Sequence, residues 1–312
     1  FAADEQEKLF QEALKKRLAF IFKDEKLDKT HLGVHVFSLS RQESLFDLNP
    51  DAALSPASAI KMLTALVALK RLGPDYTYKT EVYADGPVRN GVLHGNLFLK
   101  GGGDPSLVTE RMYLLVTEVL RSGIHQVTGS IVTDDWVFDQ VKFDANRIPS
   151  DTDRAYNAPI GGLSFNYNTT TVYFRPGDNA GDKPRVIVEP DTGYIDILNK
   201  AKTGGRNSGY GLVASRIKGS AGDTILVKGN IAQSMAEQRS YFNIVSPPLY
   251  AGQALKYFLE MRGVKVVGSE IKHQQVPLSA RKVAELESLP LREIVILMNK
   301  FSNNFIAETL VK

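Results

Sequence analysis

The sequence predicts an α+β protein in which helical segments near both ends of the chain enclose a β-rich middle. Helical periodicity runs through residues 4–22 and 55–72, and it returns at 249–262 and 290–300. Between about 76 and 245, short β-branched and aromatic runs alternate with Gly, Asp and Pro turns. This order predicts an antiparallel sheet covered by helices and built from both ends of the chain. A β-rich insertion interrupts that domain.

The change from helical to β-rich sequence patterns also predicts the domain division. A first segment covers residues 1–75, the insertion covers 76–245, and a second segment covers 246–312. The insertion carries one predicted helix near 107–122 and enough strands for two subdomains. Strands outside it are expected at 32–39 and 265–267. The strands expected within the insertion are 78–83, 95–100, 128–133, 170–174, 185–189, 194–198 and 224–227.

Composition excludes several classes of function. The chain has 312 residues, of which 43% are hydrophobic and 23% charged, which is ordinary for a globular protein. Its 38 basic and 35 acidic residues are interspersed, which argues against a dedicated nucleic-acid binder. The absence of cysteine excludes disulfides and thiol catalysis. The five scattered histidines do not indicate a metal site, and Trp136, the only tryptophan, is expected to anchor a core.

The segment 54–64 carries the strongest chemical signal. Ser55 suits a helix N-cap and Pro56 suits the first helical position, so Ser58 is expected in the first turn. There, free backbone N–H groups and the positive end of the helix dipole favour a developing anion. Lys61 follows three residues later and therefore lies on the same helical face as Ser58.

Lys61 is the only ionisable side chain between Ala57 and Leu69. A helix that is apolar on nearly every side is normally buried, and burial disfavours the charged form of a lysine and lowers its pKa. A neutral amine beside a serine hydroxyl is a general base, so Ser58 is the predicted nucleophile. The alternative is a capped core helix whose lysine extends to the surface.

Spacing alone does not identify this pair, because the pattern S-x-x-K occurs three more times. Those copies are Ser215 with Lys218, Ser269 with Lys272, and Ser279 with Lys282. They lie in strand-like or highly charged surroundings and have no apolar helix behind them.

A wider set of motifs resembles a known family. The family-like segments are 58–61, 97–107, 156–159, 163–166 and 298–304. Together they resemble the class C low-molecular-mass penicillin-binding proteins, which are D-alanyl-D-alanine carboxypeptidases and endopeptidases. The resemblance extends from about residue 30 to the end of the chain. It implies a serine β-lactamase/transpeptidase-like domain around the β-rich insertion.

Enzymes of this type use S-x-x-K, then S-x-N, then K-T-G on a strand. Ser302-Asn303-Asn304 matches the second motif, and so does Ser164-Phe165-Asn166, which Lys202-Thr203-Gly204 follows. We favour Ser302, because it separates two helical segments, whereas residues 202–209 are rich in Gly, Asn and Ser and predict an exposed loop.

The resemblance assigns roles to three further residues. It implies that Ser302 relays a proton between Lys61 and the leaving amine, and that Asn304 holds the substrate backbone. It also implies that Asp151 holds the free amino group of a diaminopimelate side chain, the alternative being a solvated turn aspartate. No metal or organic cofactor is expected.

The third motif has no counterpart after Ser302. A catalytic sheet without the K-T-G strand exposes an edge and lacks one oxyanion-hole donor. We therefore expect a cut or nicked polypeptide, in which a second fragment of the same protein supplies that strand.

The predicted function is that of a penicillin-sensitive serine DD-peptidase, a carboxypeptidase, an endopeptidase or both. Peptidoglycan stem peptides are the expected substrates, β-lactams are expected covalent inhibitors, and the expected location is periplasmic or extracytoplasmic. The alternatives are a serine β-lactamase, a peptidase acting on ordinary L-peptides, and a non-catalytic peptidoglycan-binding or scaffolding protein.

Overall fold

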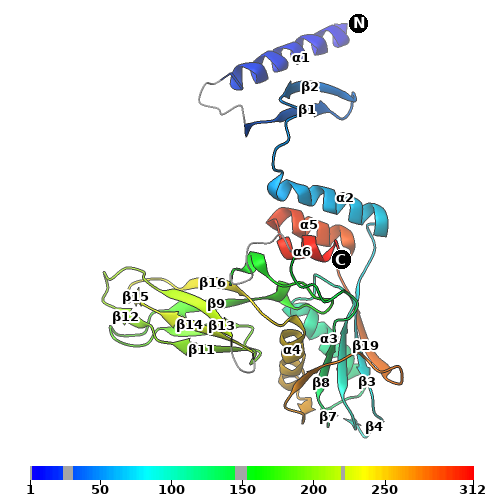
Figure 1. The fold of residues 1–312 in the computed structure, drawn as a ribbon, viewed down its shortest axis with the longest axis vertical. Coiled ribbons are helices and arrows are strands. Elements are labelled where there is room, and N and C mark those ends of the chain that lie inside the picture. Colours follow the sequence, from blue (N-terminus) through cyan, green and yellow to red (C-terminus); the bar gives the residue numbers. More distant parts are fainter. Residues whose placement is uncertain (1, 24–30, 145–152, 219–221) are drawn as a thin grey trace. The chain divides into compact units, whose positions relative to one another are not determined.

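A computed structural model describes residues 2–23, 31–144, 153–218 and 222–312 (Figure 1). The chain divides into two compact units, residues 1–60 and residues 61–312. Each unit is described by itself below.

The first unit contains a long helix and a β-hairpin. Helix α1 spans Ala2–Ile21, which confirms the helix predicted over 4–22. Strand β1 (Val34–Ser38) confirms the strand predicted over 32–39, and it pairs antiparallel with β2 (Glu43–Leu48), which was not predicted. The unit ends in the 3₁₀ helix η2 (Ala57–Ile60), which leads directly into the first helix of the second unit.

The centre of the second unit is a mixed five-stranded sheet with the order β18-β8-β6-β3-β19. Strand β8 is parallel to β6 and β18, whereas β3 is antiparallel to β6 and β19. Helices α3 (Thr109–Arg121) and α4 (Pro247–Met261) cover one face (Figure 1). The strands are β3 (Lys79–Ala84), β6 (Leu97–Gly101), β8 (Ile131–Asp134), β18 (Ile271–His273) and β19 (Arg281–Glu287).

Alternation along β3 explains why one face of this sheet is covered and the other is polar. Val82 is fully buried toward the helices, whereas its neighbours Glu81 and Tyr83 are only partly buried. A small second sheet with the order β17-β7-β5-β4 adjoins it. Its strands are β4 (Val88–Arg89), β5 (Val92–Leu93), β7 (Gln126–Val127) and β17 (Lys265–Val266).

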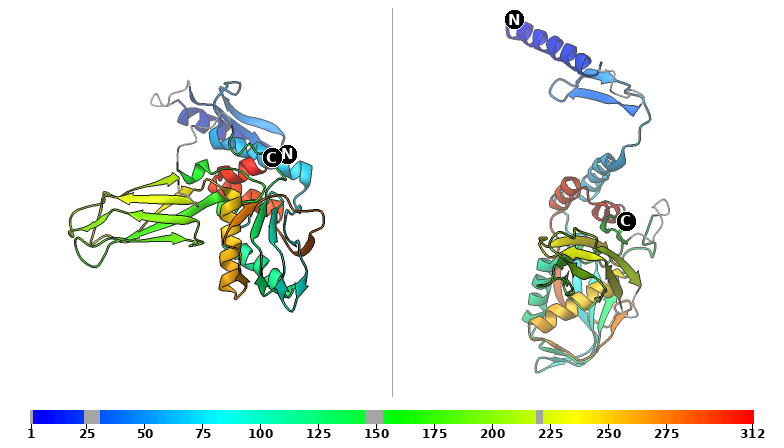
Figure 2. Two further views of the ribbon diagram at one scale, coloured as in Figure 1. Left: turned by 60° about the horizontal axis from the view of Figure 1, so that its bottom comes forward. Right: turned by 90° about the vertical axis from the view of Figure 1, so that its left-hand side faces the viewer.

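A β-rich lobe projects to one side of α4 (Figure 2). It contains two three-stranded sheets and one strand pair, and Val172, Phe174, Ile225 and Val227 are fully buried in it. Its first sheet contains β9 (Thr169–Arg175), β10 (Arg185–Glu189) and β16 (Gln238–Asn243). The others contain β11 (Ile195–Asn199), β13 (Val213–Lys218) and β14 (Asp223–Lys228), and β12 (Lys202–Gly204) with β15 (Asn230–Ala232).

A helical layer forms the remaining part of the second unit. It consists of α2 (Lys61–Leu72), α5 (Leu291–Phe301) and α6 (Asn304–Thr309). Ala65 and Ala68 of α2 pack in one core with Ile294 and Met298 of α5 and Phe305 of α6. The 3₁₀ helices η3 (Ala155–Asn157) and η4 (Asn166–Asn168) lie between β8 and β9 in sequence.

Helix α2 differs from its prediction in two respects. The α-helix begins at Lys61, because Ala57 has a left-handed φ of 43° and a 3₁₀ turn follows it. Within the second unit taken by itself, the helix is also not buried on nearly every side as expected. Four apolar side chains of α2 are half exposed or more, with exposed fractions of 64% for Met62, 55% for Leu63, 61% for Leu66 and 50% for Val67. The helix ends as predicted, at Gly73, whose φ is +90°.

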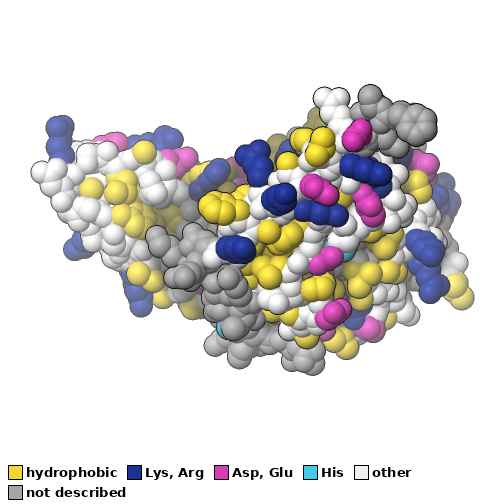
Figure 3. All heavy atoms as spheres, turned by 90° about the horizontal axis from the view of Figure 1, so that it is seen from above, with side chains coloured by type: hydrophobic (Ala, Val, Ile, Leu, Met, Phe, Trp, Pro, Cys, Tyr) yellow, Lys and Arg dark blue, Asp and Glu magenta, His cyan; other side chains and the backbone are white. Residues whose placement is uncertain are grey.

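The α+β class is confirmed, and the pairing of β19 adds to the domain organisation. Strand β19 pairs with β3 along their whole length, so strands from both sides of residue 245 share one sheet. The boundaries at 75 and 245 stay a prediction, and this pairing favours a return to the first domain after Glu287. None of the helices among the described residues is both long enough and apolar enough to cross a membrane. On the face drawn in Figure 3, described basic, acidic and hydrophobic side chains are interspersed.

Helix α3 provides a matched test of the core. Leu115 is fully buried, whereas its neighbour Leu114 is 50% exposed. We expect Leu115→Ala to lower the free energy of unfolding by about 2–5 kcal/mol, because it leaves a cavity. Leu114→Ala is expected to change it by less than about 1 kcal/mol. Urea denaturation followed by circular dichroism measures both, and equal losses would contradict the packing of α3 against the sheet.

Candidate active site

Lys61 is the centre of a polar cluster in the second unit. It is the first residue of α2, and only 6% of its surface is exposed. Its Nζ donates to the Ser302 carbonyl oxygen at 2.8 Å, to Ser302 Oγ at 3.2 Å and to Asn304 Oδ1 at 2.6 Å. The two predicted motifs therefore meet in one set of hydrogen bonds, although Lys61 and Ser302 lie 241 positions apart in the sequence.

The junction between α5 and α6 presents the two partners of Lys61. Ser302 ends α5 in the left-handed conformation, with φ 52° and ψ 39°, which turns the chain sharply. Asn303 then caps α6, and its side chain accepts a hydrogen bond from the backbone N–H of Ile306 at 3.0 Å. The prediction that Ser302 lies on a short loop between two helices is confirmed.

A second contact fixes the orientation of the Asn304 amide. Its Nδ2 donates to the Tyr156 carbonyl oxygen at 3.2 Å, while its Oδ1 accepts from Lys61. Because one end of the amide donates and the other accepts, the two contacts together determine which way it points.

Two opposing effects act on the ammonium group of Lys61. Burial lowers the pKa of Lys61 from its ordinary value, because the charged form loses its hydration. The negative charge of Glu308 raises the pKa in part. Burial is the larger effect, so Lys61 loses its proton more readily than a solvated lysine does. This direction is the one that a general base requires.

The predicted nucleophile lies in the turn before this cluster. Ser58 is the second residue of the 3₁₀ helix Ala57–Ile60, not a member of the first turn of α2 as expected. It precedes Lys61 by three residues, and the 3₁₀ turn continues directly into α2. Asp151, the predicted substrate-binding acid, lies outside the described residues.

Two neighbours of the cluster had no role in the sequence prediction. Glu308 follows Asn304 by four residues on α6, a spacing that puts both side chains on one helical face. This spacing could have identified Glu308 from the sequence. No sequence signal could have identified the Tyr156 carbonyl, because any residue type offers a backbone oxygen at that position.

The alternative triple of motifs has structural roles. Ser164 is only 4% exposed, and its hydroxyl donates to the Gly161 carbonyl at 3.0 Å and accepts from Asn168 Nδ2 at 2.9 Å. Lys202–Gly204 is not an exposed loop as predicted but strand β12, in which Thr203 is 1% exposed and accepts a hydrogen bond from the backbone of Gly177.

The other S-x-x-K copies lack a helical setting. Lys218, Lys272 and Lys282 lie in strands β13, β18 and β19. Across the part of the chain that the structure describes, no group of three or more His, Asp or Glu side chains is arranged to hold a metal ion. Trp136 does not anchor a core as expected, because 38% of its surface is exposed.

Comparison with known proteins places the chain in a family. The profile of the D-Ala-D-Ala carboxypeptidase 3 (S13) family matches residues 14–312. A D-alanyl-D-alanine carboxypeptidase from Actinomadura sp. (strain R39) is 33% identical over an alignment of 309 residues that covers 96% of this chain and 56% of that protein. The D-alanyl-D-alanine carboxypeptidase DacB of Haemophilus influenzae is 24% identical over 284 residues, 91% of this chain and 58% of that protein.

A solved structure supports the same assignment. The crystal structure of penicillin binding protein 4 (dacB) from Haemophilus influenzae matches with a TM-score of 0.74 and 25% identity, covering 89% of this chain and 61% of that one. The same protein complexed with a novel β-lactam matches with a TM-score of 0.67 and 23% identity, covering 89% and 59%. This chain thus spans between half and two thirds of the length of these relatives.

These matches confirm the predicted transpeptidase-like fold, and the family match covers both motifs that meet at Lys61. The chain belongs to the D-Ala-D-Ala carboxypeptidase 3 (S13) family.

Proposed function

We propose that this chain carries the acylating residues of a penicillin-sensitive serine DD-peptidase. Ser58 Oγ attacks the carbonyl carbon of the penultimate D-alanine of a stem peptide, and Lys61 takes the hydroxyl proton. The new C–O bond replaces the C–N bond of the substrate, and the leaving amine receives the proton through Ser302. Water then hydrolyses the ester, which releases the shortened peptide and restores the Ser58 hydroxyl.

The observation that carries this proposal is the buried Lys61 amine held by oxygen atoms of Ser302 and Asn304. A lysine kept only for packing or solubility does not need two side chains from a distant motif around its nitrogen. The lowered pKa of Lys61 supports its role as the base. The Ser302 hydroxyl, 3.2 Å from Nζ, is within reach for relaying a proton.

The substrate class follows from the family and from the relatives. Relatives named D-alanyl-D-alanine carboxypeptidase support stem peptides of peptidoglycan as substrates, and endopeptidase action on the cross-link is the second activity we propose. The β-lactam complex of the Haemophilus influenzae relative supports covalent inhibition by β-lactams. A cell-wall substrate implies a periplasmic or other extracytoplasmic location.

The apolar face of α2 supports a sheet as its packing partner. Met62, Leu63, Leu66 and Val67 form a contiguous row at helical spacing, and a row of this kind usually packs against another element. We propose that a catalytic sheet covers this face and that its third-motif strand comes from a second fragment of the same protein. That strand also supplies the remaining oxyanion-hole donor.

Acylation by penicillin tests the proposed nucleophile. We expect one penicillin adduct per molecule in the protein that includes the third-motif fragment, measured by mass spectrometry. Ser58→Ala is expected to abolish the adduct, whereas Ser164→Ala, which removes the serine of the alternative motif, is expected to retain it.

The same experiment separates the alternatives. An adduct that survives Ser58→Ala would show that another serine reacts. Fast release of hydrolysed penicillin would indicate a β-lactamase, and a folded, complete protein that gains no adduct would indicate a binding or scaffolding protein.

The pH dependence of acylation tests the proposed base. Because the base must be neutral, the second-order rate of reaction with a fluorescent penicillin is expected to rise with pH through the lowered pKa of Lys61. Glu308→Gln removes the charge that raises this pKa, so the rising limb is expected to move to lower pH. Glu293→Gln, which changes an exposed acid in the first turn of α5, is expected to leave the profile unchanged. A shift in the opposite direction for Glu308→Gln would contradict the assignment of Lys61 as the base.

Asp151 is tested by a choice of substrate. If its carboxylate holds a side-chain ammonium, Asp151→Asn is expected to lower kcat/KM about tenfold for a peptide with a free side-chain amine, the effect of losing one charged hydrogen bond. The same peptide with that amine acetylated serves as the control and is expected to be turned over equally by both proteins. An equal loss for both peptides would show that Asp151 has a structural role only.

A further inference from the structure

The short helix η3 connects the β-rich lobe with the cluster around Lys61. It packs against strand β16 of the lobe and also against helix α6 (Figure 1). Its Tyr156 carbonyl oxygen accepts a hydrogen bond from Asn304 Nδ2 of α6 at 3.2 Å. The next carbonyl oxygen, that of Asn157, accepts one from Asn243 Nδ2 of the lobe at 2.8 Å. One turn of backbone therefore joins an asparagine of the site to an asparagine of the lobe.

The amide of Asn243 has a fixed orientation. Asn243 is the last residue of β16 and is only 2% exposed. Its Nδ2 donates to the Asn157 carbonyl oxygen, while its Oδ1 accepts from Arg216 Nε at 3.2 Å. Because one end of the amide donates and the other accepts, these two contacts determine which way it points. The amide of Asn304 is fixed in the same manner on the other side of η3.

Arg216, which holds the amide oxygen of Asn243, is itself anchored in the interior of the lobe. Its side chain is 12% exposed, and its Nη1 lies 3.7 Å from Asp223 Oδ1. The side chain of Asp223 is 1% exposed. Its Oδ2 accepts hydrogen bonds from the backbone N–H of Val245 at 2.9 Å and from the Tyr194 hydroxyl at 3.2 Å. The contact with η3 thus begins from a buried and well-connected group of side chains.

Main-chain contacts hold the start of η3 independently of the Asn243 side chain. Arg154 forms an antiparallel β-bridge with Phe242. The backbone N–H of Asn243 donates to the Asp153 carbonyl oxygen at 3.0 Å. The side chain of Asn243 instead holds the end of η3, at Asn157. Its removal therefore leaves η3 attached to the lobe and releases only the part that faces α6.

We propose that Asn243 is a positioning residue of the active site, which acts on Lys61 through η3 and Asn304. The Asn243 amide keeps η3 in place, and the Tyr156 carbonyl then holds Asn304 Nδ2. The Oδ1 atom of Asn304 stays directed at the Lys61 amine as a result. Small displacements of such groups are costly for catalysis. This role rests on the proposed function, and it gives the β-rich lobe a part in the reaction.

A double-mutant cycle tests this route in the protein that includes the third-motif fragment. Asn243→Ala is expected to lower the second-order rate of acylation by a fluorescent penicillin about tenfold, because Asn304 and Lys61 lose their fixed geometry. In a protein that already carries Asn304→Ala, the same change is expected to lower the rate less than about twofold. The amide that Asn243 positions is absent there.

Asn199, the last residue of β11, offers a matched control in the same lobe. Its Nδ2 donates to the Pro184 carbonyl oxygen at 2.8 Å, and its Oδ1 accepts from the backbone N–H of Ala201 at 3.1 Å. Its amide therefore also joins a donor to an acceptor, and both partners lie outside η3. Asn199→Ala is expected to leave the acylation rate unchanged.

A second variant at the same position removes a single contact. Asn243→Asp keeps the size of the side chain and the acceptor for Arg216, and it removes only the donor to the Asn157 carbonyl oxygen. It is expected to lower the acylation rate as Asn243→Ala does. It replaces the alanine variant in every measurement if that variant does not fold.

The side-chain amide of Asn304 gives a readout that does not depend on the reaction. In protein labelled with ¹⁵N-asparagine, its NMR signal is the one that Asn304→Ala removes. We expect Asn243→Ala to move this signal toward the position of a solvated asparagine amide. Asn199→Ala is expected to leave it where it is.

Three outcomes would overturn the positioning role. They are an equal loss of rate in the presence and absence of the Asn304 side chain, an equal loss for Asn199→Ala, and an Asn304 signal that does not respond to Asn243→Ala. The proposed function fails separately. If the unchanged protein gains no penicillin adduct while the Asn304 signal responds to Asn243→Ala alone, the proposed function is wrong and the positioning of Asn304 stands.

Discussion

The burial of one amine organises the chemistry of this protein. An isolated ammonium group in a protein interior is costly, and here three oxygen atoms from Ser302 and Asn304 surround the nitrogen of Lys61. Those oxygens come from the sharp turn between α5 and α6, so that turn has to be held firmly against α2. The packing of Ala65 and Ala68 against α5 brings the helices close enough for the lysine to reach. The small side chains of Ala65 and Ala68 thus allow the long side chain of Lys61 to reach the turn.

The large insertion serves as a frame for these helices. Strand β3 follows α2 in the chain and β19 precedes α5, and the two strands pair over their full length. The two ends of the segment between Ala84 and Arg281 are therefore fixed side by side by main-chain hydrogen bonds. The same sheet carries α3 and α4 on one face and a row of ion pairs between β3 and β19 on the other. One sheet supports two separate surfaces, and a change in its register would disturb both.

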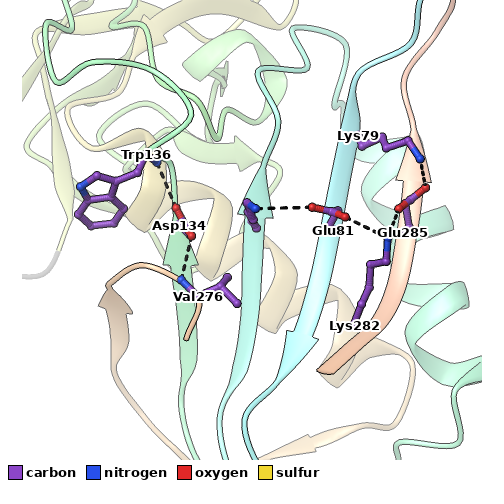
Figure 4. Close-up of polar contacts among 8 residues, drawn as sticks. Lys79, Glu81, Asp134, Trp136, Val276, Lys282 and Glu285 are labelled. Atoms are coloured by element: carbon purple, nitrogen blue, oxygen red, sulfur yellow. Dashed lines mark hydrogen bonds and ion pairs between the residues drawn. The ribbon is translucent and has the colours of Figure 1, made fainter. Parts of the chain in front are cut away.

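The sequence was sufficient for the fold class and most helices, because residue type and local context carry those signals. The meeting of Lys61 with Ser302 and Asn304 was expected from the S-x-N motif and from the resemblance to the family. The sequence was insufficient where the deciding contact is distant. Strand β19 contains mostly charged residues and was not predicted, since its lysines and glutamates pair across the sheet at an edge (Figure 4). Residues Lys202–Gly204 were predicted to be a loop, but they form a strand because they pair with β15. The left-handed Ala57, which delays the start of α2, has no signal in its residue type.

The separation of Lys61 from Ser302 by 241 residues also governs when the site comes into existence. Contacts of such long range form late in folding, because the entropy of closing the loop is lost before the contact stabilises anything. While the chain is being synthesised, Lys61 is a solvated, charged lysine and a poor base. Burial lowers its pKa only after the sheet has closed and delivered the α5–α6 turn. The hydrogen bonds around Lys61 therefore exist only once the second unit has folded completely.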